Sequence, residues 1–87
     1  MITIGYASEF LKKFKKFEHG FQDEIIEKII LFRNSKNHKQ LKVHKLNGQF
    51  SECYSFSVNY KTRIVFEYNK KAESALLLTI GDHDIYK

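Results

Sequence analysis

The stretch from residue 51 to 68 alternates so that small and polar side chains share one set of positions. Cys53, Ser55 and Ser57 fall at every second position, and Arg63 and Glu67 continue the pattern after a short turn. An arginine guanidinium can donate two parallel hydrogen bonds to neighbouring phosphate oxygens. A polar sheet face with such an arginine can therefore bind a phosphate backbone. The same pattern is also typical of an ordinary solvated face of a two-layer protein.

A second group of reactive side chains lies in the last seven residues, 81–87. His83 stands between Asp82 and Asp84, and Tyr86 follows. Histidine can give and take a proton near neutral pH, and tyrosine can donate to an oxyanion or stack under a base. The tail therefore carries acid–base candidates, and a solvated chain end is the alternative interpretation.

The sequence predicts neither a metal site nor a cofactor. One thiol, Cys53, cannot build a zinc site alone, and a cysteine in a strand is usually a small packed hydrophobe. The histidine–aspartate tail provides too thin a ligand set, and there is no glycine-rich phosphate-binding loop. We therefore expect the chemistry to use the chain's own side chains.

These groups need elements that position them, and the hydrophobic pattern predicts two helices after a first strand. Residues 1–6 alternate as a short strand. Ser8 is expected to cap a first helix, and Gly20 is expected to end it. A second helix follows with Asp23 and Glu24 in its first turn and a broad apolar face over residues 25–32.

Three strands are predicted in the second half of the chain, over residues 51–58, 62–68 and 75–80. The last of them is a near-continuous apolar run, which favours a central strand covered on both sides. The order β-α-α-β-β-β predicts an α+β fold, in which an N-terminal helical hairpin packs on one face of an antiparallel sheet. The first strand is expected at an edge or beside the last strand.

Size and charge limit the classes of function. The chain has 87 residues, which indicates a single domain spanning 1–87. Its net charge of +5 favours a polyanionic partner, either nucleic acid or an acidic protein surface. A single cysteine, no leader and no apolar run of membrane-spanning length predict a cytoplasmic protein that does not contact a membrane.

Three motifs in order along the chain resemble the RelE/ParE toxin superfamily of bacterial type II toxin–antitoxin systems. They are H-K-L-N-G at 44–48, Y-K-T-R-I-V-F at 60–66 and I-G-D-H-D-I-Y at 80–86. Because it has a histidine near the C-terminus, the chain is similar to the mRNA-cleaving branch of the superfamily, which includes YafQ, YoeB and RelE. The resemblance implies a toxin that inhibits translation as a metal-independent endoribonuclease. It would cleave mRNA, commonly on the ribosome, through attack of the 2′-hydroxyl, and a cognate antitoxin would occlude it.

The resemblance also implies roles for individual residues. Arg63 would clamp the phosphate and neutralise the charge of the transition state. His83 would be the acid or base at the cleaved bond, His44 a second acid–base candidate, and Tyr86 would position the base or phosphate. The lysines expected to anchor the RNA backbone are Lys42, Lys45 and Lys61.

The sequence departs from the family pattern at the position of the general base. The YafQ branch has a histidine where this chain has Ser57, and an Asp–Trp pair near Thr62 and Arg63. YoeB uses a glutamate, for which Glu52 and Glu67 are only loose candidates here. The resemblance therefore assigns the class of reaction but leaves the general base open.

Two other functions are compatible with the same sequence. A ParE-like toxin would inhibit DNA gyrase without nuclease activity, using the tail as a protein contact. A passive RNA- or protein-binding domain with a degraded site would not be toxic. For each toxin, the antitoxin is expected to be acidic or amphipathic and to cover the basic face.

Overall fold

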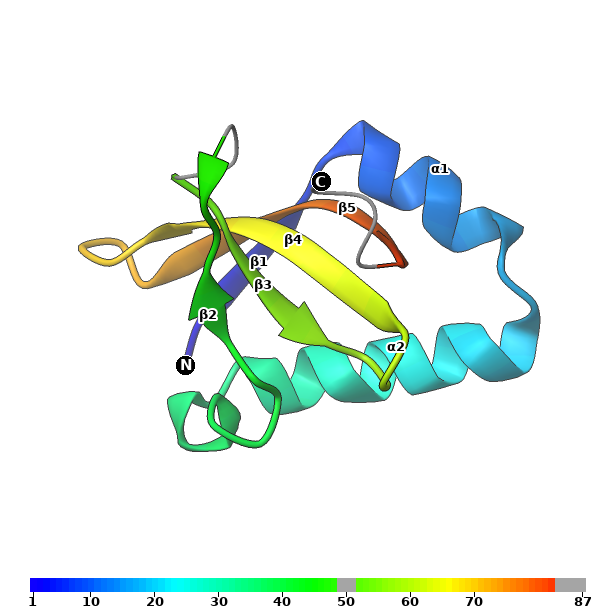
Figure 1. Ribbon diagram of the computed structural model, residues 1–87, viewed down its shortest axis with the longest axis horizontal. Coiled ribbons are helices and arrows are strands. Elements are labelled where there is room, and N and C mark those ends of the chain that lie inside the picture. Colours follow the sequence, from blue (N-terminus) through cyan, green and yellow to red (C-terminus); the bar gives the residue numbers. More distant parts are fainter. Residues whose placement is uncertain (49–51, 83–87) are drawn as a thin grey trace.

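The computed structural model describes residues 1–48 and 52–82, and it places two helices and a five-stranded sheet in the order shown in Figure 1. His83 and Tyr86 lie outside the described residues. The elements are β1 (Thr3–Tyr6), α1 (Ser8–Lys16), α2 (His19–Phe32), a short 3-10 helix η1 (Ser35–Asn37), β2 (His44–Lys45), β3 (Tyr54–Ser57), β4 (Thr62–Asn69) and β5 (Ser74–Asp82).

The predicted α+β fold with an N-terminal helical hairpin is confirmed, and the sheet has the strand order β1-β5-β4-β3-β2. The first strand lies both at an edge and beside the last strand. It pairs with β5 in parallel, so the sheet is mixed, while the other pairs are antiparallel. A parallel pair needs a long connection between its strands, and here the rest of the chain provides it. The two-residue strand β2 was not predicted, because two residues show no alternation.

The helix ends differ from the sequence prediction. Gly20 does not end α1; the first helix stops at Lys16, and Gly20 lies in the first turn of α2. The side-chain amide of Gln22 donates to the carbonyl oxygens of Phe14 and Phe17 at 3.0 and 2.9 Å. These bonds satisfy carbonyls that the end of a helix leaves without partners. The sequence of α1 alone does not predict these hydrogen bonds, because the donor, Gln22, belongs to α2.

The helix starts also differ. Ser8 is the first helical residue and Ala7 occupies the N-cap without a side-chain hydrogen bond. Because α2 already begins at His19, Asp23 and Glu24 lie beyond its first turn. Ser8, Asp23 and Glu24 therefore each lie later in their helix than the position at which they would stabilise its start.

Aromatic side chains fasten α2 to one face of the sheet. Phe32 is fully buried and stacks on Phe56 of β3, with ring centroids 4.4 Å apart and planes 7° apart. It also meets Phe66 of β4 edge-on at 4.7 Å. Ile25 and Ile29 of α2 join the same buried cluster. This cluster fixes which face of β3 and β4 points inward.

We expect Phe32→Ala to lower the free energy of unfolding by about 3–5 kcal/mol, because it removes a buried ring and leaves a cavity. Ile30→Ala, a control on the same helix at a side chain that is 59 % exposed, should cost less than about 1 kcal/mol. Urea titration followed by circular dichroism measures both. Equal losses for the two variants would contradict the central place of Phe32.

Candidate functional site

The sheet register gathers several predicted residues on the face opposite α2. Residues directly opposite each other on antiparallel strands share a face. One row across the sheet consists of His44, Ser55, Val65 and Thr79, and the next consists of Ser57, Arg63 and Gly81. The fold therefore brings His44 and Arg63 to one surface, which we call the polar face after the residues of these two rows.

Arg63 is held by the turn between β3 and β4. Its Nη1 donates to the carbonyl oxygen of Asn59 at 2.9 Å. The Asn59 side chain in turn accepts from the backbone amides of Lys61 and Thr62, at 2.9 and 2.7 Å, which fixes the turn. An asparagine that bonds the backbone two residues on is a standard turn device. The guanidinium is thus positioned by the hairpin itself.

No carboxylate compensates the charge of Arg63 among residues 1–48 and 52–82. Within that part of the chain the ion pairs are Met1–Glu73 and Lys13–Glu9. The side chain of Arg63 is half-buried, and the hydrogen bonds it makes with described residues all come from Nη1. Its Nε and Nη2 make no hydrogen bond with the described residues, and a partly desolvated guanidinium binds a phosphate or carboxylate strongly.

His44 stands at the edge of the polar face with one ring nitrogen fixed. Its Nδ1 lies 2.9 Å from the carbonyl oxygen of Lys42. Because that oxygen can only accept, Nδ1 carries the proton in the neutral ring, and Nε2 keeps a free lone pair. The ring is exposed. In the neutral ring, Nε2 is therefore the nitrogen of His44 that can accept a proton.

His44 and Arg63 are separated by two strand spacings and one row. Standard sheet spacings place their Cα atoms about 12 Å apart. The hydrogen bond from Arg63 Nη1 to the Asn59 carbonyl oxygen directs the guanidinium toward the β3–β4 turn, on the side of its row away from His44. The sheet therefore places a possible proton acceptor and an anion-binding group on one surface.

The polar face is less open than the sequence indicated. Ser55 and Val65 are fully buried, and Leu46, Cys53 and Val65 form a second small apolar cluster with Leu78. Both interpretations of this pattern, a phosphate-binding face and an ordinary solvated face, require side chains that are open to solvent, and the burial of Ser55 and Cys53 contradicts this for this part of the sheet. The sequence does not reveal this burial, because serine and cysteine are small enough to lie either at the surface or in a packed interior.

Two hydroxyl groups on this face have no hydrogen-bond partner within the described part of the chain. They are the Oγ atoms of Ser55 and Ser57, and both are buried. A buried polar group without a partner costs about 1–3 kcal/mol. Ser57 lies directly opposite Arg63 in the register of β3 and β4, so the two side chains share this face.

Cys53 has an environment that opposes nucleophilic chemistry. Burial raises the pKa of its thiol, and the negative charges of Glu67 and Glu52 raise it further. The thiolate is the reactive form, so a raised pKa makes the sulfur inert near neutral pH. The interpretation of Cys53 as a packed residue agrees with this environment.

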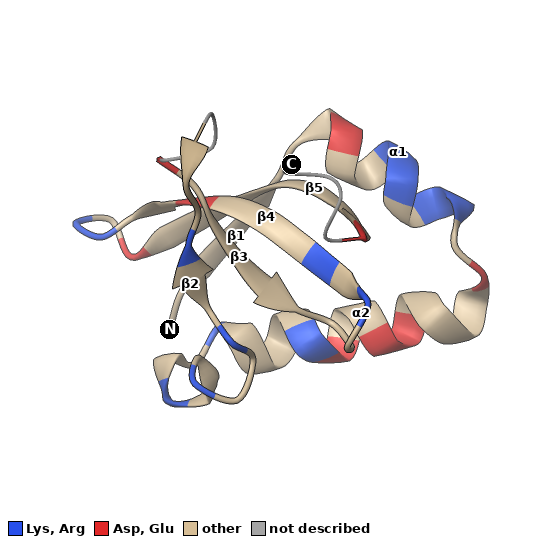
Figure 2. Cartoon of the chain, in the orientation of Figure 1, with Lys and Arg blue, Asp and Glu red and all other residues tan. Residues whose placement is uncertain are grey.

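The predicted lysines are not all on the polar face. Lys45 pairs with Tyr54, which packs against the main core, so Lys45 belongs to the other side of the sheet. Lys42 lies in the loop before β2 with a left-handed backbone, φ 58°, and Lys61 lies in the β3–β4 turn. Figure 2 shows that lysine and arginine also cover α1 and the loops around the sheet.

One lysine outside the predicted site residues reaches the polar face from α1. Lys13 Nζ donates to Thr79 Oγ1 at 2.9 Å and lies 3.4 Å from a carboxylate oxygen of Glu9. Sixty-six residues separate Lys13 from Thr79. No local pattern predicts such a contact, since Lys13 is one of four lysines in the helix.

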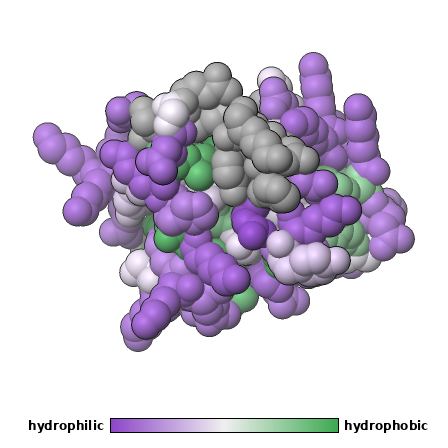
Figure 3. All heavy atoms as spheres, viewed as in Figure 1, coloured by the Kyte–Doolittle hydropathy of each residue, from purple (hydrophilic) through white to green (hydrophobic). Residues whose placement is uncertain are grey.

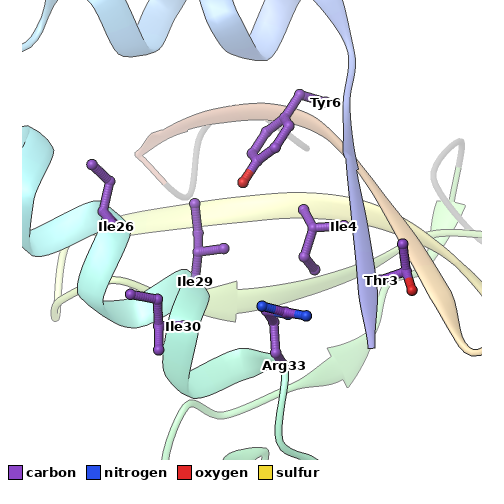
Figure 4. A pocket seen from close by; sticks show the side chains of 7 residues that line it. All are labelled: Thr3, Ile4, Tyr6, Ile26, Ile29, Ile30 and Arg33. Carbon is purple, nitrogen blue, oxygen red and sulfur yellow. The ribbon is translucent and has the colours of Figure 1, made fainter. Parts of the chain in front are cut away.

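An apolar hollow lies on the other side of the sheet, between β1 and α2 (Figure 4). Exposed or partly exposed side chains of Tyr6, Ile26 and Ile30 line it, and Arg33 closes one end. Arg33 is also tied to the backbone, because its Nε donates to the Ile2 carbonyl oxygen at 3.0 Å. The hollow lacks a histidine or carboxylate, so it is not a candidate for acid–base chemistry.

The surface of the described residues is mostly hydrophilic in the view of Figure 3. Within residues 1–48 and 52–82, no three His, Cys, Asp or Glu side chains are grouped so that they could hold a metal ion. The helices in this part are also too short or too polar to cross a membrane.

No protein-family model and no curated protein matches the sequence. Solved structures do match over nearly the whole chain. A chain of the RelBE2 toxin–antitoxin complex from Mycobacterium tuberculosis is 10 % identical with a TM-score of 0.75, and the match covers 94 % of this chain and 98 % of that one. For a chain of the YoeB–YefM complex from Staphylococcus aureus the values are 16 %, 0.73, 95 % and 98 %.

A chain of the intact RelBE toxin–antitoxin complex from E. coli is also similar, at 16 % identity and a TM-score of 0.72, with 94 % of this chain and 96 % of that chain covered. Identities of this size show a shared fold. The resemblance to the RelE/ParE superfamily is therefore confirmed for the fold of this protein.

We expect Ser55→Ala to leave the free energy of unfolding unchanged or to raise it by up to about 2 kcal/mol, because it removes a buried hydroxyl that has no partner among residues 1–48 and 52–82. Urea titration gives the value. A loss of more than about 1 kcal/mol would show that the hydroxyl makes a stabilising hydrogen bond.

Proposed function

We propose that this chain, which has the RelE-type toxin fold, is the toxin of a type II toxin–antitoxin system and cleaves mRNA as an endoribonuclease. The observation that carries the proposal is the half-buried Arg63 guanidinium, which has no carboxylate partner among the described residues and shares a sheet face with His44. The solved structures similar to this chain, which are named as toxin–antitoxin complexes, support the same class.

The proposed reaction uses the 2′-hydroxyl of the RNA as nucleophile. His44 Nε2 takes the 2′-hydroxyl proton while the 2′-oxygen bonds to phosphorus. The bond from phosphorus to the 5′-oxygen breaks, which leaves a 2′,3′-cyclic phosphate, and the leaving oxygen needs a proton. His83 is the proposed donor. Arg63 stabilises the extra negative charge on the phosphorane oxygens.

The remaining predicted residues have supporting roles in this proposal. Tyr86 positions the base or phosphate, and Lys42, Lys45 and Lys61 bind the RNA backbone. Each phosphate contact releases counterions, so RNA binding should weaken steeply as salt is raised. Because Lys45 lies on the other side of the sheet, its contribution should be smaller than that of Lys61.

The proposed partners are mRNA, the ribosome and a cognate antitoxin, all in the cytoplasm. The chain carries fifteen Lys and Arg against ten Asp and Glu. An acidic segment of the antitoxin is complementary to that charge and would block Arg63 and His44 when it lies over the polar face.

To test the proposal, cells express the wild-type chain, Arg63→Gln or His44→Ala, and primer extension maps cuts in total mRNA. We expect growth arrest with discrete cuts for the wild type. Arg63→Gln should lower the cleavage rate about 10²–10³-fold, since it removes a donor to the transition state, and His44→Ala about 10²–10⁴-fold.

The matched control is Arg33→Gln, because Arg33 is the other arginine of the chain and lies in the apolar hollow. It should cut mRNA at the wild-type rate. Growth arrest with intact mRNA would contradict the nuclease and favour a ParE-like inhibitor of gyrase, which a supercoiling assay then measures. Normal growth with the wild-type chain would contradict both toxins.

A further inference from the structure

A hollow of about 460 Å³ lies where α1 meets the polar face. In Figure 1, α1 runs beside β5, and the two elements are in contact. The residues that line the hollow are Ala7, Ser8, Glu9, Lys13, Val65, Leu78 and Thr79. Val65 and Thr79 belong to the row next to that of Arg63. Val65 follows Arg63 by two residues on β4, a distance of about 7 Å.

Glu9 and Lys13 offer an acceptor and a donor side by side at this hollow. Thr79, which is 7 % exposed, accepts from Lys13 Nζ at 2.9 Å. A hydrogen bond from Thr79 and the nearby ammonium of Lys13 lower the pKa of Glu9, so its carboxyl group is ionised at neutral pH. Thr79 therefore anchors the pair, while both charged ends stay accessible to a ligand.

Apart from Ser8, the rest of the hollow is apolar. Val65 and Ala7 contribute aliphatic groups, and Leu78 is placed there by an irregularity in the sheet. Val65 pairs with Thr79 and Phe66 with Leu77, so Leu78 has no residue opposite it on β4. A bulge of this kind re-aims a side chain, and Leu78 packs against the second cluster, on the polar face.

We propose that this hollow binds one nucleobase of the RNA, next to the phosphate held by Arg63, and that it selects cytosine or adenine. This inference rests on the proposed function for the identity of the ligand. Cytosine and adenine each present an exocyclic amino group beside an unprotonated ring nitrogen. The Glu9 carboxylate accepts from the amino group, and Lys13 donates to the ring nitrogen.

The arrangement disfavours the other ligands that RNA offers. In that orientation uracil places a carbonyl opposite the Glu9 carboxylate and an N–H opposite the Lys13 ammonium. Guanine does the same with O6 and N1–H, so both polar contacts are mismatched for these two bases. A phosphate would be repelled by the Glu9 carboxylate and would lie against Val65 and Leu78, which cannot donate to it. The pair therefore reads a base edge, whereas Arg63 in the next row holds the backbone.

The test is an NMR titration of the full chain with CMP or UMP, which differ at this base edge. We expect CMP to shift the amide signals of Glu9, Lys13 and Thr79 and to bind about 5- to 150-fold more tightly than UMP, the range expected for a two-point base contact. Glu9→Ala should remove this preference. Glu27→Ala, the same change at an exposed position of α2, should retain it.

Equal binding of CMP and UMP to the wild-type chain would overturn the base site, and so would a preference that survives in Glu9→Ala. Mapping of mRNA cuts separates this inference from the nuclease proposal. Cuts that stay at the same positions and frequencies in Glu9→Ala overturn the base site and leave the nuclease standing. A CMP preference that depends on Glu9, in a chain that cuts no RNA, supports the base site and removes the nuclease.

Discussion

The register of β3 against β4 is the constraint on which the rest of the structure depends. Phe32 of α2 packs on Phe56 and Phe66, and these two residues can face α2 only if their neighbours face the other way. A shift of one residue would exchange the two faces of a strand. It would bury Arg63 against the helix and expose the aromatic rings. The aromatic cluster therefore sets the direction in which Arg63 and Ser57 point.

The polar face contains an arginine and two serines whose placement lowers stability if their role is only structural. Arg63 is partly removed from water without a carboxylate among the described residues, and the hydroxyls of Ser55 and Ser57 are buried without partners there. Each of these features costs stability in the absence of a ligand. An anion bound at Arg63 would offset part of that cost, and a ligand that stabilises only the folded state also raises its apparent stability.

Much of the fold and part of the site could be predicted from the sequence, because they depend on alternation along single elements. The strands around Phe56 and Ile64, and the shared face of Ser57 and Arg63, follow from a period of two residues. The ends of α1 and α2 could not be predicted, because Gln22 of one helix supplies the partner for the other. The Lys13–Thr79 contact joins α1 to β5 and leaves no trace in local sequence.

The most direct test of the central claim follows the side-chain Nε–H signal of Arg63 by NMR while an RNA oligonucleotide made non-cleavable by 2′-deoxy substitution is added. The account predicts that this signal shifts in parallel with RNA-strand binding, and that the corresponding signal of Arg33 stays in place. A strand that binds while the Arg63 signal does not move would contradict the claim that this guanidinium holds the phosphate.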